Sequence, residues 1–135
     1  MWSHYSDSHS GYSIGYNSQK LFEQTKAQLG PVQYESDFPK FSLFGEHIEY
    51  FIKYAYTKSD IWKYENEYRL LKDYSSRKVV KLSEDTIDEV ILGNKMEQPT
   101  KFQLIELIVK KYPKAAIFDC KLHKSKFELT LERVG

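Results

Sequence analysis

Three charged residues, Glu65, Glu67 and Arg69, alternate with uncharged neighbours along one short stretch of the chain. If this stretch is a β-strand, residues two apart share one face and lie roughly 6.5 to 7 Å apart. One glutamate can then act as a base or orient a hydroxyl, while Arg69 keeps it ionised or binds an anionic group. Trp62, just upstream, adds a ring beside them. A solvent-exposed charged strand face explains the same pattern and is the more frequent case.

A second group of functional side chains opens the chain: Trp2, His4, Tyr5, Asp7 and His9. The rings of Trp2 and Tyr5 suit stacking on a ligand, and His4 can donate a hydrogen bond, so the segment is a candidate pocket wall. A packed aromatic turn explains it equally well. The spacing of His4, Asp7 and His9 matches no established ligand pattern, so we expect no metal site.

Three weaker signals lie further along the chain. Gly93-Asn94-Lys95 falls between a predicted strand and a predicted helix, where free backbone N–H groups can hold an anion. Six lysines between Lys110 and Lys126 are candidates for phosphate contacts, although their mixed sequence favours a solvated face. Cys120 alternates with apolar residues toward the predicted core, so we do not expect it to act as a nucleophile.

Composition limits the class of protein. A chain of 135 residues is long enough for one domain with a real core. Its formal net charge of +1 supplies no field that attracts nucleic acid or an anionic membrane, so neither partner is expected. The single cysteine excludes an internal disulfide and fits a reducing compartment. With no membrane-spanning run and no signal peptide, we expect a cytoplasmic protein.

The elements that must position these residues follow from periodicity. Helices are expected from Asn17 or Ser18 to Leu29, stopping at Gly30-Pro31, and over Ile48–Tyr56. A third helix is marked by apolar residues from Phe102 to Tyr112, with Pro99 in its first turn and Pro113 at its end. Strands are expected at Tyr12–Tyr16, Val32–Glu35, Trp62–Tyr74, Val79–Leu82 and Glu89–Leu92, with a C-terminal β-hairpin that turns at Lys124-Ser125. In the hairpin, Phe118, Cys120, Leu122, Phe127, Leu129 and Leu131 should point inward. The fold class is therefore α+β, a mostly antiparallel sheet with about three helices in a single domain, residues 1–135.

Four blocks of sequence, taken in order, resemble the bacterial domain-of-unknown-function family 2971. They are Met1-Trp2-Ser3-His4-Tyr5 through Tyr12, Val32-Gln33-Tyr34, Lys58-Ser59-Asp60-Ile61-Trp62 through Arg69, and Glu89-Val90-Ile91-Leu92-Gly93. In that family the Trp-Ser-His-Tyr block sits well inside the protein, behind an upstream half with its own strands. The resemblance implies that this chain corresponds to the C-terminal portion of a longer family domain and that Met1 is not a natural start.

The family's layout of strands is similar to ADP-ribosyltransferase-like folds, in which a glutamate positions the ribose or the acceptor of NAD. That analogy implies NAD as cofactor, Glu67 or Glu65 as the catalytic carboxylate, and Trp2, His4 and Tyr5 on the nicotinamide side. The strands that would carry the first NAD-contacting residue are missing here, so the implied site is incomplete. Fold alone does not establish function.

Two hypotheses follow for an uncharacterised bacterial or phage protein. The first is a nucleotide- or NAD-using transferase whose site joins Glu65, Glu67 and Arg69 to the opening segment. The second is a non-catalytic binding or interaction module, a truncated relative that associates with another chain through an exposed strand edge. The substrate, the reaction and the oligomeric state do not follow from the sequence.

Overall fold

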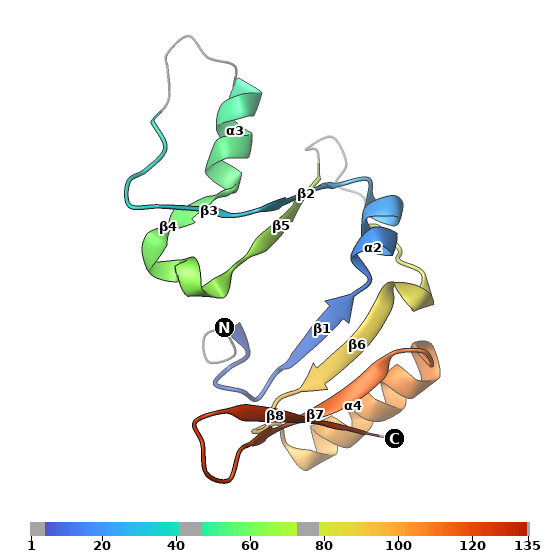
Figure 1. Ribbon diagram of the computed structural model, residues 1–135. Coiled ribbons are helices and arrows are strands. Elements are labelled where there is room, and N and C mark those ends of the chain that lie inside the picture. Colours follow the sequence, from blue (N-terminus) through green and yellow to red (C-terminus); the bar gives the residue numbers. More distant parts are fainter. Residues whose placement is uncertain (1–4, 41–46, 73–78, 135) are drawn as a thin grey trace. The chain divides into compact units, whose positions relative to one another are not determined.

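The computed structural model describes residues 5–40, 47–72 and 79–134, which fall into two compact units. Unit 1 is formed by Met1–Gln24 together with Val79–Gly135, and unit 2 by Thr25–Lys78. Unit 2 is thus one continuous segment between the two parts of unit 1 (Figure 1). Whether the two units make a single domain stays a prediction.

Unit 1 is built on a four-stranded mixed sheet in the order β1-β6-β7-β8. Its strands are β1 (Tyr12–Tyr16), β6 (Ile87–Leu92), β7 (Ala116–Leu122) and β8 (Leu129–Arg133). The pairs β1–β6 and β7–β8 are antiparallel, but β6 and β7 run parallel because helix α4 (Gln98–Lys111) connects them. The predicted helix, the strand ending at Gly93 and the C-terminal hairpin are all confirmed.

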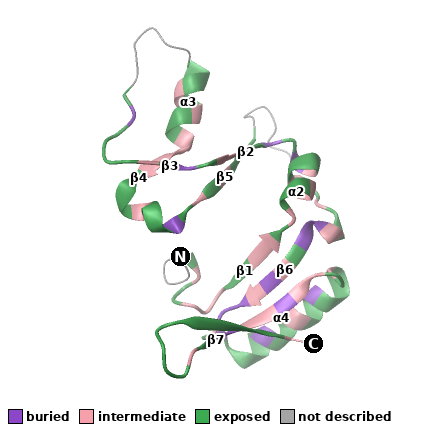
Figure 2. Cartoon of the chain, in the orientation of Figure 1, coloured by how far each residue is buried: buried purple, intermediate pink, exposed green. Residues whose placement is uncertain are grey.

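Helix α4 covers one face of this sheet and closes the core of unit 1 (Figure 1). Pro99 lies in its first turn, where the missing N–H costs nothing, and Pro113 follows its end. Figure 2 colours buried residues purple. The buried members of this core are Ile87, Val90, Leu92, Met96, Ile108 and Ile117. Burial of these apolar side chains is the main stabilising term of this unit.

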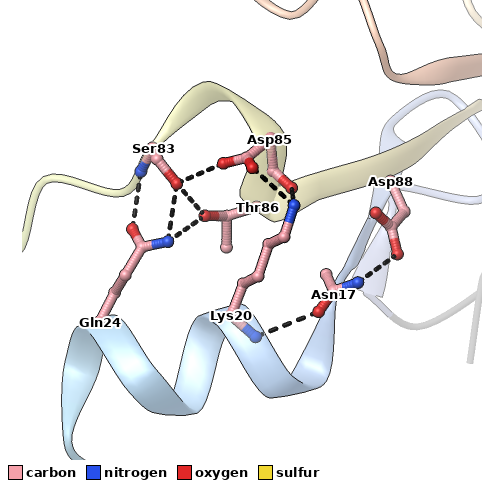
Figure 3. Close-up of polar contacts among 7 residues, drawn as sticks. All are labelled: Asn17, Lys20, Gln24, Ser83, Asp85, Thr86 and Asp88. Carbon is pink, nitrogen blue, oxygen red and sulfur yellow. Dashed lines mark hydrogen bonds and ion pairs between the residues drawn. The ribbon is translucent and has the colours of Figure 1, made fainter.

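Helix α2 (Ser18–Thr25) is fastened to the short 3₁₀ helix η2 (Glu84–Thr86) by a set of polar contacts (Figure 3). Lys20 Nζ lies 2.6 Å from Asp85 Oδ2, and Gln24 Nε2 donates to Ser83 Oγ and Thr86 Oγ1. Asn17 Oδ1 accepts from the Lys20 N–H at 3.1 Å, which confirms the predicted N-cap. We call these contacts the α2 latch.

Within its described residues, unit 2 holds two two-stranded sheets, one α-helix and one 3₁₀ helix. Strand β2 (Gln28–Pro31) pairs antiparallel with β5 (Tyr68–Leu71), and β3 (Gln33–Glu35) pairs parallel with β4 (Thr57–Ser59). Helix α3 (His47–Ala55) precedes β4, and the 3₁₀ helix η1 (Asp60–Glu65) follows it. The helix predicted over Ile48–Tyr56 is therefore confirmed.

Two predicted elements before and within unit 2 were wrong. The helix expected to reach Leu29 ends at Thr25, because Lys26 is left-handed (φ 51°) and the next residues pair with β5. Gly30-Pro31 belongs to β2 and is no helix stop. The strand expected over Trp62–Tyr74 begins as η1, ends its 3₁₀ turn at left-handed Asn66 and is a strand only over β5. Tyr74 lies outside the described residues.

Two predictions in unit 1 were also wrong. Residues Val79–Leu82 form no strand, and Val79 is exposed. In the hairpin, Cys120 is buried as expected, but Leu122, Phe127, Leu129 and Leu131 are exposed. The reason is that α4 packs on the other face of the sheet, the face of Ile117 and Asp119, as the Lys101–Asp119 contact shows.

The fold class is confirmed as α+β, with mixed sheets and C-terminal strands. Among the helices within the described ranges, none is long and apolar enough to cross a membrane.

Candidate functional site

The charged residues singled out in the sequence form one ion-pair network in unit 2, together with Lys58. Only 3% of the Glu65 side chain is exposed, and the side chains of Glu67, Arg69 and Lys58 are at most 29% exposed. The exposed-face interpretation of this stretch was therefore wrong. The tertiary structure gathers two carboxylates and two cations at a partly buried position, where electrostatic interactions are stronger than in water.

Arg69 is held by two elements at once. Its Nε donates to Glu67 Oε1 at 2.6 Å and its Nη2 to Glu67 Oε2 at 3.2 Å, a two-pronged contact that fixes the plane of the guanidinium. Its Nη1 donates to the carbonyl of Ala55 at 2.5 Å, the last residue of α3. A cation at this position satisfies a free carbonyl and complements the negative end of the helix.

Lys58 joins the two glutamates. Its Nζ is 3.1 Å from Glu67 Oε2, contacts Glu65 Oε2 more closely, and lies 5.2 Å from the centre of the Trp62 ring. The η1 conformation explains this arrangement, because residues three apart in a 3₁₀ helix lie on the same side. Trp62 and Glu65 therefore face the same lysine. The lysine was missed as a site residue, because it lies seven and nine residues before the two carboxylates and no local pattern links it to them.

Glu67 is kept ionised by this network. Its pKa lies below the usual 4.5, first because of the hydrogen bond from Arg69 and then because of the one from Lys58, although burial acts in the opposite direction. Its backbone N–H donates to the Tyr34 hydroxyl at 2.8 Å, which fixes the chain at this point. A carboxylate in this state accepts hydrogen bonds and is not a proton donor near neutral pH.

Glu65 differs from Glu67 in how its oxygens are used. Oε2 accepts from Lys58, but Oε1 is buried and has no hydrogen-bond partner among the described residues. The Glu65 side chain is almost completely buried, so it contacts Lys58 but cannot be reached by a ligand. Its position supports a role in holding the lysine, and Glu67 is the more accessible of the two carboxylates.

A cavity of about 350 Å³ adjoins this network. Lys58 and Arg69 line it, whereas Glu65 and Glu67 do not. The other lining residues come from the end of β3 and the segment after it, the end of α3 and strand β4: Glu35, Ser36, Asp37, Phe38, Pro39, Tyr54, Ala55, Thr57 and Ser59. The cations thus share a cavity with rings, hydroxyl groups and two carboxylates. This combination suits an anionic ligand that also carries a ring and hydrogen-bond donors.

The predicted pocket wall at the start of the chain belongs to unit 1, not to unit 2. Trp2 and His4 lie outside the described residues, and Tyr5 is an exposed residue of unit 1. Trp62 contacts Lys58 in unit 2 and is the one predicted ligand-contacting residue that the described structure brings to the network. The prediction that Trp2, His4 and Tyr5 line the same site as Glu67 stays a prediction.

The weaker candidates of unit 1 have structural roles. The N–H groups of Gly93 and Lys95 donate to the carbonyls of Gly11 and His9, so the predicted anion site at this turn was wrong. A Cβ atom at Gly93 would lie 2.1 Å from the His9 oxygen, which explains the glycine. Burial raises the pKa of the Cys120 thiol, and the side chain packs in the interior as expected.

No group of three His, Cys, Asp or Glu side chains within residues 5–40, 47–72 and 79–134 is arranged to hold a metal ion. Of the six lysines expected to form a solvated face, Lys121 pairs with Glu132 at 2.6 Å and Lys126 lies 3.9 Å from Glu128. Among the described residues, neither observation adds a candidate site to the one in unit 2.

Comparison with known proteins matches residues 1–70 to a family model described as a protein of unknown function, DUF2971. No curated protein and no solved structure matches the chain. The matched range contains every residue that lines the cavity and all four members of the ion-pair network. It stops before the block Glu89–Gly93, and the correspondence to a C-terminal portion of the family stays a prediction. Since the match covers more than half of its length, the chain belongs to the DUF2971 family.

Proposed function

We propose that this protein binds an anionic small molecule that carries a ring, of the nucleotide class, in the cavity of unit 2. The observation that carries the proposal is the orientation of the network: Lys58 and Arg69 line the cavity, and their carboxylate partners do not. A guanidinium held on two sides by Glu67 and Ala55 needs little reordering when it meets an anion.

The remaining wall of the cavity fits the same ligand class. Phe38 is 86% exposed and Tyr54 also largely exposed, so both rings are available for stacking on a base. The hydroxyl groups of Ser36, Thr57 and Ser59 suit a phosphate or a sugar. The carboxylates of Glu35 and Asp37 disfavour a purely anionic ligand and favour one with hydroxyl or amino donors, as nucleotides have.

Isothermal titration calorimetry with ADP, NAD, ribose 5-phosphate and adenosine tests this proposal. We expect saturable binding of the two nucleotides and at least about tenfold weaker binding of adenosine, because adenosine lacks the charge-assisted contacts. Arg69→Gln should weaken binding of every anionic ligand by about tenfold or more. Arg133→Gln, an exposed arginine of unit 1 outside the cavity, is the matched control and should bind like the wild type.

Because Arg69 also contacts the end of α3, a second variant tests the cavity without touching the network. Phe38→Ser should weaken ADP binding and leave ribose 5-phosphate unchanged, since only ADP carries a base to stack. Circular dichroism checks that each variant is folded. Absence of saturable binding by all the anionic ligands, or wild-type affinity in both variants, overturns the proposal.

A transferase that acts on the bound nucleotide is the second candidate function. It is favoured by Glu67, an ionised and partly exposed carboxylate that shares Arg69 with the cavity wall. Glu67 does not line the cavity, so in this candidate the ribose extends past Arg69 to Glu67, which accepts a hydrogen bond from a ribose hydroxyl and stabilises positive charge that develops on the sugar. Glu65 then positions Lys58.

Release of nicotinamide from NAD, followed by liquid chromatography, separates the two functions. With water as the acceptor, the transferase breaks the bond between nicotinamide and the ribose C1, joins that carbon to the water oxygen and releases nicotinamide, so it predicts release by the wild type and its loss in Glu67→Gln. Binding of NAD without any release removes the second candidate and leaves the binding function in place.

A further inference from the structure

Strand β8 is an open edge of the sheet in unit 1 (Figure 1). All five of its residues are exposed, and its register with β7 runs without interruption over five pairs. The opposite edge, β1, has a register shift between Gly15 and Tyr16. Such an irregularity makes an edge strand less suitable for pairing with another strand. Of these two edges, β8 is the better template for a further strand.

The hydrogen bonds at the two ends of the β7–β8 ladder show which backbone groups of β8 point outward. The Val134 N–H donates to the Ile117 carbonyl, and the His123 N–H to the Glu128 carbonyl. Hydrogen-bonded pairs alternate with non-hydrogen-bonded pairs in an antiparallel ladder. The N–H and C=O groups of Leu129, Leu131 and Arg133 are therefore directed away from β7.

The side chains beside this edge form an apolar row. Leu129 lies opposite Leu122 on the face of the sheet that α4 does not cover, and Leu131 follows two residues later. Leu131 is 50% exposed, and the other two leucines are exposed as well. Thr130 and Glu132 alternate with them on the other face. A partner strand would gain backbone hydrogen bonds and apolar contacts together.

We propose that β8 pairs antiparallel with β8 of a second copy of this chain, with the two-fold axis at Leu131. The outward-directed residues must face one another, which leaves three symmetric registers in which the strands overlap well. An axis at Thr130 places Glu128 opposite Glu132 of the copy, and an axis at Glu132 places that carboxylate opposite itself. Like charges in direct opposition are unfavourable.

The axis at Leu131 avoids both conflicts. It places Leu131 opposite its own copy, Leu129 opposite Arg133, and Thr130 opposite Glu132. Rotation about an axis perpendicular to the sheet keeps each face on its own side, so the leucine row continues into the second copy. Pairing of one strand buries a small area, so the dimer is weak and depends on concentration.

Analytical ultracentrifugation of the full chain over a wide concentration range tests the proposal, and we expect a monomer–dimer equilibrium. Leu131→Pro should abolish the dimer, because it removes the outward N–H at the two-fold axis. The variant should still fold, since an edge strand tolerates proline where the lost N–H faces outward. Tyr12→Pro is the matched control on β1, where the Gly93 N–H to Gly11 bond likewise directs the Tyr12 N–H outward. It should leave the dimer intact. Leu131→Lys, which opposes like charges at the axis, serves if the proline variant does not fold.

Cross-linking tests the register. Thr130 and Glu132 of the copy form a non-hydrogen-bonded pair, whose Cα atoms lie about 4.5 Å apart, within reach of a disulfide. The double variant Thr130→Cys, Glu132→Cys should form a covalent dimer under mild oxidation, while Thr130→Cys alone should not, because Cys120 is buried. A monomer at every concentration, a dimer unaffected by both Leu131 variants, or efficient cross-linking of Thr130→Cys alone overturns the proposal.

Discussion

At the scale of single residues, the central feature is one carboxylate shared by two cations. Glu67 accepts hydrogen bonds from Arg69 and Lys58, and these contacts lower its pKa. A group whose pKa is lower in the folded state stabilises the fold above its unfolded pKa. That stabilisation is present above pH 4.5 and is lost as the pH falls through the folded pKa.

Glu67→Gln should therefore reduce the free energy of unfolding near pH 7 by about 1 kcal/mol, since it leaves Lys58 and Arg69 with one charged partner fewer. The difference from the wild type should shrink below pH 4.5 as the wild-type carboxylate becomes protonated. Urea unfolding followed by Trp62 fluorescence, in a Trp2→Phe background, measures it.

The control is Glu128→Gln, whose carboxylate lies 3.9 Å from Lys126 on the exposed surface. Exposed pairs of this kind contribute little, so its effect should stay within roughly 0.5 kcal/mol. An equal effect of the two substitutions, or a difference at Glu67 that does not depend on pH, would contradict the role assigned to the network.

At the scale of elements, short helices depend on tertiary contacts for stability. Helix α2 has eight residues, and its exposed Phe22 contributes little burial. The α2 latch supplies polar anchors instead (Figure 3). Lys20 and Ser83 lower the pKa of Asp85 to about 2, so the carboxylate stays ionised well below neutral pH.

Asp85→Asn should speed amide hydrogen exchange across α2, because the ion pair with Lys20 and the contact to Ser83 both weaken. In the wild type the same loss of protection should appear as the pH falls from 3.8, the usual pKa of an aspartate, through about 2, the pKa at which Asp85 takes up its proton in the folded state. Exchange is read by mass spectrometry on α2 peptides after correction for the pH dependence of the intrinsic rate.

Asp88→Asn is the comparison, since Asp88 contacts Asn17 at a long 3.4 Å on the exposed surface. It should leave α2 protection near the wild-type value. Similar exchange in all three proteins would show that the latch does not hold the helix.

At the scale of the whole molecule, unit 2 is a continuous insertion between the two segments of unit 1. The length of the chain predicts one domain, and one domain unfolds cooperatively. A lesion in the core of unit 1 then lowers the stability of unit 2 as well.

Leu92→Ala provides this lesion, because Leu92 is 0% exposed in the core under α4. We expect a loss of about 3 kcal/mol from the missing apolar contacts and the cavity left behind. Hydrogen exchange at increasing urea, read on peptides from β6 and β5, reports the two units separately. Exposed Leu107→Ala is the control and should cost under about 1 kcal/mol. If β5 keeps its wild-type protection while β6 loses it, the units are separate domains.

The local sequence pattern was sufficient to locate an element where that element has a regular apolar period or a distinct end. Helix α4 lies between Pro99 and Pro113, and β1 and the β7–β8 hairpin alternate clearly, so their positions were predicted to within a few residues. The orientation of faces was less predictable. The buried side of a strand depends on where α4 packs, and no local pattern carries that information.

The candidate site, too, was predictable only in part. The residue types of Glu65, Glu67, Arg69 and Trp62 were enough to identify a polar stretch that could carry chemistry, while periodicity predicted the α+β class and four sequence blocks indicated the family. Only the tertiary structure decided that Glu65 ends a 3₁₀ turn, that Lys58 joins the two carboxylates, and that the cations rather than the carboxylates line a cavity. The sequence pattern determines which side chains are present and their local period. Contacts between residues distant in sequence depend on packing, which involves all the elements at once.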